Sequence, residues 1–457
     1  MSEDFLHYLW QNRLFAEQLT TTDGDPITII STGFHNHNSG PDFSDARLTI
    51  GDTTWAGNVE IHINTSDWFK HGHQLDEAYN NVVLHVVYNN DVIKSDSVMP
   101  VCELAGRIDI ELFEAYKRFI ERNEFVPCSS KISEVSELDR SFWLERMLIE
   151  KLELKADFMQ DALTVSQNDW EEALYHIIAR SFGFSVNALP FEMLARSVSY
   201  QILARHSDNL FQIEALLFGQ AGMLSHDLID IYGQELFKEY SYLRKKYKLV
   251  PMSDSLWKFM RMRPVNFPTI RISQFACFIN RNAGLMSKLI SLDTVQEMMA
   301  LFQVNASEYW NNHYVFDKES TIKNVSDKES LKKNLSDEKT SHQHISNKES
   351  SSKPKHLGKD AAQLLIINAV LPFMFNYGSA TGNDQLSNRA LSMFEALPGE
   401  RNSVISGWTV AGLKADTAWS TQALMHLKMQ YCDKRACLNC RIGNLIIKSP
   451  GFLTITR

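Results

Sequence analysis

The pattern of hydrophobic residues changes once along this chain, near residue 105, and this change limits the possible folds more than any other feature. Before it, short segments alternate apolar and polar residues as strands do, at 27–31, 46–50, 55–64 and 82–88. From about Leu138 onward, apolar residues recur at helical spacing, over 142–159, 170–182, 191–204, 211–223 and 228–247. Strands followed by many helices predict an α+β chain.

The strand-rich part has an expected order of elements. Leu6, Trp10 and Leu14 repeat at helical spacing, which predicts a first helix over Glu3 to Glu17. Residues 66–70 predict a short capped helical turn between the last two strands. The predicted domains are an α/β domain (1–105), a helical domain (106–315), an insertion (316–357) and a helical C-terminal region (358–457).

The predicted insertion stands out by its composition. It is rich in Lys, Ser, Glu and Asn, and the tetrapeptide Asp-Lys-Glu-Ser at 317–320 returns at 327–330 and, with Asn first, at 347–350. Such a segment has too few apolar residues to bury, so we expect it to be disordered. A tolerated surface insertion and a regulatory segment are the two interpretations.

Charge and compartment give further expectations. No basic leader precedes an apolar stretch, and the longest apolar run, Ala361 to Phe375, is interrupted by polar residues and Pro372. Six cysteines in 457 residues are typical of a reducing compartment. These features predict a cytoplasmic protein without a membrane span.

The acidic charge is concentrated in the α/β part. Residues 1–105 hold 15 Asp and Glu against four Lys and Arg, and also seven of the 15 histidines. Such a module repels a phosphate backbone unless a divalent cation or a basic neighbour compensates. Carboxylates and histidines together are the composition of a metal site and also of an ordinary polar surface.

The most informative motif combines Gly40-Pro41-Asp42-Phe43 with the strand over 55–64. Side chains alternate along a strand, so Glu60 and His62 share one face while Val59 and Ile61 share the other. If the loop carrying Asp42 precedes the neighbouring strand, its carboxylate meets Glu60. Two carboxylates suit Mg²⁺ or Mn²⁺, which prefer oxygen ligands.

These residues and the order of elements resemble the PD-(D/E)xK nuclease superfamily over residues 1–105. The resemblance implies a restriction-endonuclease-like core, metal binding by Asp42 and Glu60, an auxiliary acid at Glu17 and DNA or RNA as substrate. His62 stands where that superfamily usually has lysine. A neutral imidazole offers the scissile phosphate less positive charge, although it binds metal or moves a proton. An inactive nuclease-like binding module is the alternative.

A second resemblance covers most of the chain outside the insertion. Residues 3–10 (EDFLHYLW), the GPDF and VEIH segments, residues 214–222 (EALLFGQAG) and the terminal cysteines resemble a bacterial family of unknown function, family 2851. This resemblance implies no activity.

A His-x-His pair supplies another candidate metal site. His71 and His73 follow Ser66-Asp67, and Asp76 and Tyr79 come shortly after. Imidazole pairs with carboxylates bind Zn²⁺, so a zinc-dependent hydrolase is a third hypothesis beside a structural role for this loop. His85 lies in a predicted apolar strand, so we interpret it as a core histidine.

Three cysteines crowd near the C-terminus, at Cys432, Cys437 and Cys440. Thiolates at this spacing bind zinc or an iron–sulfur cluster once a fourth ligand is present, and Cys128 is the best candidate for it. Three free, reduced thiols are the alternative.

Basic and aromatic residues alternate over 257–271, which include Arg261, Arg263 and Arg271. Arginine grips phosphate in a bidentate manner and stacks on bases, so this segment is a candidate nucleic-acid contact. A helix-to-loop junction whose arginines pair with nearby acids is the alternative. No Walker loop or Gly-x-Ser-x-Gly motif is present, so nucleotide hydrolysis and serine esterase chemistry have no support.

Overall fold

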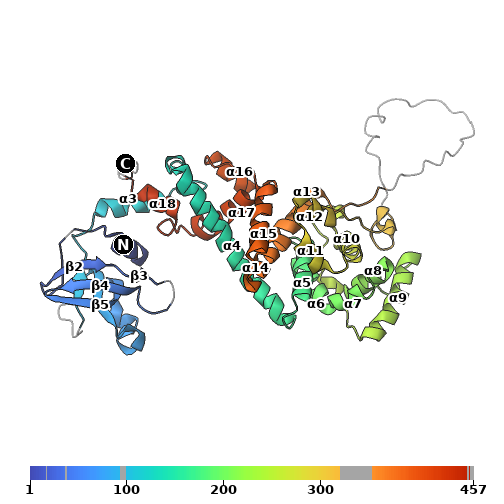
Figure 1. Cartoon of the computed structure of the whole chain (residues 1–457), viewed down its shortest axis with the longest axis horizontal. Coiled ribbons are helices and arrows are strands. Elements are labelled where there is room, and N and C mark those ends of the chain that lie inside the picture. The colour runs from blue at the N-terminus through green and yellow to red at the C-terminus, as the bar shows by residue number, and fades with distance from the viewer. Residues whose placement is uncertain (17, 37–38, 93–98, 320–352, 450–451, 453–457) are drawn as a thin grey trace, which may run out of the picture. The chain divides into compact units, whose positions relative to one another are not determined.

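The computed structural model describes residues 1–457 except 17, 37–38, 93–98, 320–352, 450–451 and 453–457 (Figure 1). The chain forms two compact units. Unit 1 comprises residues 1–147, 401–414 and 423–457, and unit 2 comprises 148–400 and 415–422. The C-terminal cysteines therefore belong to the same unit as the N-terminal sheet.

Unit 1 is built on a seven-stranded mixed sheet (Figure 1). Its strands are β1 (Leu19–Thr20), β2 (Pro26–Ser31), β3 (Phe34–His35), β4 (Phe43–Ile50), β5 (Thr53–Asn64), β6 (Val82–Asn89) and β7 (Val101–Glu103). Its helices are α1 (Glu3–Asn12), α2 (Asp67–Lys70), α3 (Ile110–Ile120), α16 (Ser403–Val410) and α18 (Arg441–Ile447), and α17 (Ala418–Leu427) enters it from unit 2.

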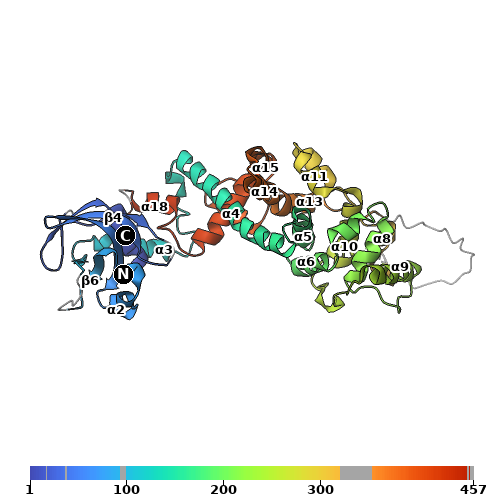
Figure 2. The ribbon, with the colours of Figure 1, turned by 60° about the horizontal axis from the view of Figure 1, so that its bottom comes forward.

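The sheet order is β1-β2-β4-β5-β6-β7, with β3 beside β4. Strands β2, β4 and β5 pair antiparallel, and β6 pairs parallel to β5 after the crossover through α2, which Figure 2 shows next to the sheet. The predicted order of helix, three strands, short helix and strand therefore occurs. The smaller strands β1, β3 and β7 were not predicted.

The first helix is shorter than predicted. Helix α1 ends at Asn12, because Arg13 adopts a left-handed conformation with φ 52° and its N–H bonds back to Leu9 and Trp10. Leu14 N then donates to Leu9 O at 2.9 Å, which closes the end of the helix. The apolar spacing that includes Leu14 therefore predicted too long a helix. Glu17 lies outside the described residues.

Unit 2 is mostly helical, as predicted. Its main helices are α5 (Trp170–Phe182), α6 (Ala188–Ser197), α7 (Tyr200–Ala204), α8 (Leu210–Gln220), α9 (Ile231–Tyr247), α10 (Pro268–Arg281), α11 (Leu285–Ser291), α12 (Val295–Leu301), α13 (Lys359–Leu365), α14 (Leu371–Thr381) and α15 (Asp384–Ala396). Helix α4 (Glu137–Val165) begins in unit 1 and continues into unit 2. A two-stranded ribbon pairs β8 (His313–Val315) with β9 (Lys318–Glu319).

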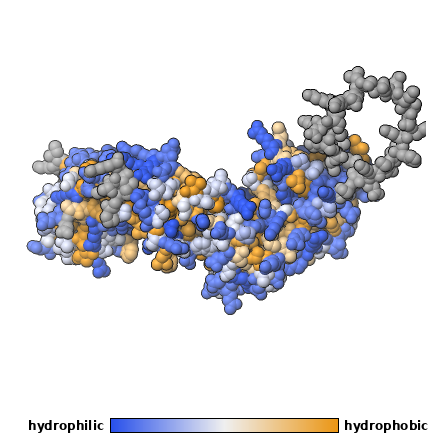
Figure 3. Space-filling model, turned by 90° about the horizontal axis from the view of Figure 1, so that it is seen from above, coloured by the Kyte–Doolittle hydropathy of each residue, from blue (hydrophilic) through white to orange (hydrophobic). Residues whose placement is uncertain are grey.

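The apolar run near residue 370 is longer than its sequence suggested. Helices α13 and α14 join through a π-helical turn, Ile366–Val370, and the run Lys359–Thr381 is long and apolar enough to span a membrane by length and composition. However, 61% of its most apolar window is buried inside the protein, as in a core helix. In Figure 3, the hydrophobic residues on the visible surface are interspersed with hydrophilic ones.

Pro372 is accommodated within this run by a substitute donor. Proline has no N–H to donate to the carbonyl of Asn368, four residues earlier. Lys155 Nζ, from α4, donates to Asn368 O at 3.0 Å instead. The π-turn and this lysine together keep the helix continuous through a proline.

The described ends of the predicted insertion are packed in unit 2. Lys355 is 7% exposed, and its ammonium donates to the carbonyl oxygens of Trp310, Asn311 and His313. Leu357 is 6% exposed. The middle of the segment, residues 320–352, lies outside the described residues, so the prediction of disorder stays a prediction there.

A buried carboxyl group links three segments of unit 2. Glu214, on α8, is 1% exposed, and its oxygens accept hydrogen bonds from the hydroxyls of Ser273, Ser307 and Tyr232. Burial raises the pKa of Glu214 despite these three donors. The folded state therefore holds the proton more tightly than the unfolded chain.

This linkage predicts that unit 2 loses stability as the pH rises through the raised pKa of Glu214. The contribution is fully present below the pKa of the unfolded chain, where both states are protonated. Between the pKa of the unfolded chain and the raised pKa of the folded state, the free energy of unfolding falls by at most about 1.4 kcal/mol for each pH unit. Glu214→Gln keeps the shape and removes the charge, so it flattens this dependence in urea unfolding from pH 4.5 to 8. Glu235→Gln, at an exposed position on α9, keeps the wild-type slope; an equal slope in the Glu214 variant contradicts the assignment.

Candidate metal centre

Asp42 and Glu60 come together at the start of β4, as the sequence predicted. Asp42 N donates to Glu60 Oε2 at 3.0 Å, and Ile61 N donates to Asp42 Oδ2 at 2.9 Å. An irregularity between Phe43 and Ala46, with Asp45 in a left-handed conformation, shifts the register of β4 against β5 next to this contact. Each carboxylate is thereby held by the other strand's backbone.

Three histidines meet beside these carboxylates. Possible ligand atoms of His62, His71 and His73 all lie within 4.8 Å of one another. His62 Nε2 lies 3.1 Å from His71 Nδ1. Glu60 Oε1 lies 3.5 Å from His62 Nε2 and 3.4 Å from His73 Nε2. Three imidazoles therefore gather at one place, with a Glu60 oxygen beside two of them.

The two predicted motifs thus form one site. His62 lies on β5, whereas His71 ends α2 and His73 opens a 3₁₀ turn, His73–Leu75. The turn between them contains Gly72, with φ 76°, a conformation that glycine adopts without strain. The crossover from β5 to β6 therefore returns the His-x-His pair to the strand that carries Glu60.

A second layer of rings supports the histidines. His62 Nδ1 lies 2.9 Å from His85 Nε2, and His85 is 1% exposed. The Tyr79 ring stacks on His73 with 3.9 Å between centroids, and Trp68 contacts both His73 and His85. His85 is thus the satisfied core histidine that was predicted, and it also fixes the orientation of His62.

His7 reaches the site from α1 and was not among the predicted site residues. His7 Nε2 lies 3.2 Å from Asp42 Oδ2. Glu3, one turn earlier, is near enough to interact electrostatically with Asp42 and His71. The i, i+4 spacing of Glu3 and His7 marks one face of a helix, but only the packing of α1 on β5 shows which face it is.

Burial sets the protonation of this centre. It lowers the pKa of His62 to about 4, with the neighbouring His73 and His71 adding to the effect, and that of His85 to about 3. Burial and then the nearby Asp42 raise the pKa of Glu60 to about 8. His62 and His85 are therefore neutral at pH 7, and a neutral imidazole is the form that binds metal ions.

The site opens to solvent on the side of His71. Glu60 and His62 are 4% and 2% exposed, whereas His71 is exposed and the Asp42 side chain keeps 22% of its surface. His62 and Glu60 therefore lie at the inner end of the centre, and His71 lies at its solvent edge.

The other predicted site residues, and the histidines of the loop before Gly40, have different surroundings. Asp76 is exposed, and its Oδ1 accepts from Ala78 N at 2.9 Å as a cap of the next 3₁₀ turn. His35 lies on β3 and stacks on Phe43. His37 and Glu17 lie outside the described residues. Arg261, Arg263 and Arg271 belong to unit 2.

The four predicted cysteines gather in unit 1. All are buried and free, and Cys432 interacts electrostatically with Cys128, Cys437 and Cys440. Gly443 lies so close to the backbone of Cys437 that a Cβ atom at residue 443 would be 2.4 Å from the carbonyl oxygen of Cys437. Among the residues that the structure describes, however, no three of these sulfur atoms all lie within 4.8 Å of one another.

Burial, followed by the neighbouring Cys440, raises the pKa of Cys437 to about 12. Burial also raises the pKa values of the other three thiols, and the neighbouring cysteines add to the effect for Cys128 and Cys432. Gathered thiols therefore resist ionisation unless a cation binds them.

Comparison with known proteins identifies one family. A family model described as "Protein of unknown function (DUF2851)" matches residues 3–337 and 328–403. The match covers all residues of the histidine–carboxylate centre and ends before the cysteine trio. No curated protein and no solved structure matches the chain.

Proposed function

Because the chain belongs to the DUF2851 family, whose description carries no activity, we propose from the geometry that it is a metal-dependent phosphodiesterase acting on nucleic acid. One observation carries this proposal: possible ligand atoms of His62, His71 and His73 all lie within 4.8 Å of one another, and a Glu60 oxygen lies beside His62 and His73. Three imidazoles and a carboxylate form the ligand set of a catalytic transition-metal site.

The ligand set favours Mn²⁺ or Zn²⁺ over Mg²⁺. Magnesium prefers an octahedron of oxygen atoms, whereas imidazole suits zinc and other transition metals. Such an ion lowers the pKa of bound water and stabilises charge on a phosphoryl group. Asp42, whose Oδ2 lies 3.2 Å from His7 Nε2, would take up the proton that the attacking water gives up.

The choice of a phosphodiester substrate rests on the resemblance to PD-(D/E)xK nucleases. In that pattern Asp42 and Glu60 share a metal, and here they are joined by backbone hydrogen bonds. The imidazole of His62, in place of the usual lysine, is a metal ligand in this proposal. In this proposal, having His62 in place of lysine therefore changes which metal is bound and leaves the class of reaction the same.

We further propose that the cysteine cluster binds zinc or an iron–sulfur cluster with a structural role. Four buried thiols from residues 128 and 432–440 gather in unit 1 and have no disulfide partners. Thiolate sulfur is the preferred ligand of both metal groups.

The function is tested with the purified full chain, freed of metal with a chelator. Labelled single-stranded DNA, double-stranded DNA and RNA are each incubated with Mn²⁺, Zn²⁺ or Mg²⁺. We expect cleavage with Mn²⁺ or Zn²⁺, seen as shorter products on a denaturing gel, and none with excess chelator. Stoichiometric metal binding without cleavage of any substrate contradicts the enzyme and selects the binding module. Absence of metal binding contradicts the centre itself.

A further inference from the structure

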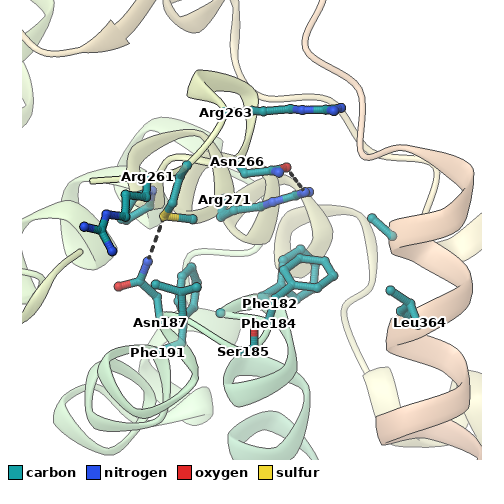
Figure 4. Close-up of a pocket in the computed structure, with 15 residues that line it drawn as sticks. Phe182, Phe184, Ser185, Asn187, Phe191, Arg261, Arg263, Asn266, Arg271 and Leu364 are labelled. Carbon is teal, nitrogen blue, oxygen red and sulfur yellow. Dashed lines mark hydrogen bonds between the residues drawn. The ribbon is translucent and has the colours of Figure 1, made fainter. Parts of the chain in front are cut away.

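Unit 2 has a pocket of about 510 Å³ whose charged lining is entirely basic (Figure 4). Its described lining residues come from α5, α6 and the loop between them, from the first turn of α10 and the segment before it, and from α13. They include Arg261, Arg263 and Arg271 and no aspartate or glutamate. The alternative interpretation of the sequence was that these arginines pair with nearby acids. No described residue of the pocket lining is an acid that could form such a pair.

Arg271 is the central feature of this pocket. It is 8% exposed, and its two terminal nitrogens donate to Gln274 Oε1 at 2.9 Å and Asn266 Oδ1 at 2.7 Å. Its guanidinium also lies over the Phe184 ring, 4.6 Å from the centre. Its Nε has no hydrogen-bond partner, and no carboxylate of the described residues lies within 4.0 Å of it. All its contacts are neutral.

A buried cation without an opposite charge is costly to keep. Burial lowers the pKa of Arg271 to about 10, so the side chain still carries its charge at pH 7. Removing such a charge from water is unfavourable, and hydrogen bonds to neutral amides replace only part of the lost hydration. An anion bound beside Arg271 would supply the missing compensation.

The surroundings of Arg271 are arranged for such a ligand. In Figure 4, Arg263 and Arg271 extend toward the same side of the pocket, with Asn266 between them, whereas Arg261 points the other way. Phe184 and Arg261 both have left-handed backbone conformations, with φ of 50° and 60°. A side chain other than glycine adopts this conformation at a cost, and such strain gathers at binding sites.

We propose that this pocket binds the phosphate group of a small ligand of nucleotide size. The guanidinium groups of Arg271 and Arg263 would hold the phosphate oxygens, because a guanidinium fork matches them in a bidentate manner. The apolar walls, from Phe182, Phe191 and Leu364, would take an aromatic or apolar body. A free nucleotide and the phosphorylated end of a strand share this chemistry. The inference does not depend on the metal centre.

The experiment measures binding to the full chain by titration calorimetry and thermal shift. The probes are inorganic phosphate, adenosine 5′-monophosphate, adenosine, and a short oligonucleotide with or without a 5′-phosphate. We expect the phosphorylated probes to bind and raise the melting temperature, and adenosine to bind at least tenfold more weakly than its monophosphate. Preference for the phosphorylated oligonucleotide over the free nucleotide identifies the strand end as the source.

Two variants and a control make the test specific. Arg271→Met should lower the affinity for the nucleotide at least tenfold without lowering the melting temperature of the free protein, because it removes an uncompensated charge. Arg263→Met, at an exposed position that cannot affect folding strongly, should lower the affinity several-fold. Arg205→Met, also exposed in unit 2, should leave it unchanged. Equal affinity in wild type and both pocket variants, or no binding of any phosphorylated probe at millimolar concentration, overturns the proposal.

Discussion

Substitution of His73 by alanine is expected to lower metal-dependent cleavage by about 10²–10³-fold, which corresponds to roughly 3–4 kcal/mol of activation free energy. His73 Nε2 lies 3.4 Å from Glu60 Oε1 and belongs to the group of three imidazoles. Its loss leaves the metal fewer protein ligands and a weaker hold on the phosphoryl group. Initial rates at saturating Mn²⁺ and at limiting Mn²⁺ separate a loss of metal affinity from a loss of turnover.

Two further variants show whether the effect belongs to the centre. His226→Ala removes a histidine whose side chain is 82% exposed in unit 2, and it should cut at the wild-type rate. His85→Asn leaves every ligand in place but removes the ring that lies 2.9 Å from His62 Nδ1. Such a supporting partner typically contributes 10–100-fold in metal affinity. If the His73→Ala protein stays folded and keeps full activity, the histidines take no part in the reaction.

Substitution of Cys437 by serine is expected to release the proposed metal of the cysteine cluster and to destabilise unit 1. Structural zinc contributes on the order of 10 kcal/mol in small metal-binding domains, so we expect a loss above about 3 kcal/mol. Metal analysis of protein purified without oxygen gives the stoichiometry. An absorption band near 400 nm distinguishes an iron–sulfur cluster from colourless zinc, and urea unfolding gives the stability.

The matched control is another buried cysteine of the same unit. Cys102, on β7, is 0% exposed, and the charges that act on its thiol come from Arg107 and Glu103 instead of another cysteine. Cys102→Ser introduces the same chemical change, so it should cost some stability and keep the full metal content. Equal metal content in the two variants would contradict the proposed site.

The sequence predicted the parts of the fold that depend on local periodicity. Alternation along residues 55–64 placed Glu60 and His62 on one face of β5, and the loop at Asp42 reaches Glu60 as expected. Helical periodicity predicted α5 and α9 closely. In contrast, the end of α1 was missed because a single left-handed residue, Arg13, stops the helix while the apolar spacing continues.

The parts that depend on tertiary packing could not be read from the sequence. That His7 faces Asp42 depends on how α1 packs on the sheet, and that the His71/His73 pair joins Glu60 depends on the path of the crossover. The isolation of Arg271 from acids also became visible only once the pocket was formed. The sequence therefore indicated candidate residue types and left their grouping open.

The return of the chain to unit 1 has a consequence during protein synthesis. The sheet strands emerge from the ribosome first, but residues 401–414 and 423–452, which complete this unit, follow only after the whole of residues 148–400. Phe452, 2% exposed, packs its ring 5.6 Å from that of Phe119 on α3. The apolar surface at Phe119 therefore stays uncovered until the last segment has been synthesised, and exposed apolar surface of this kind favours aggregation of a nascent chain.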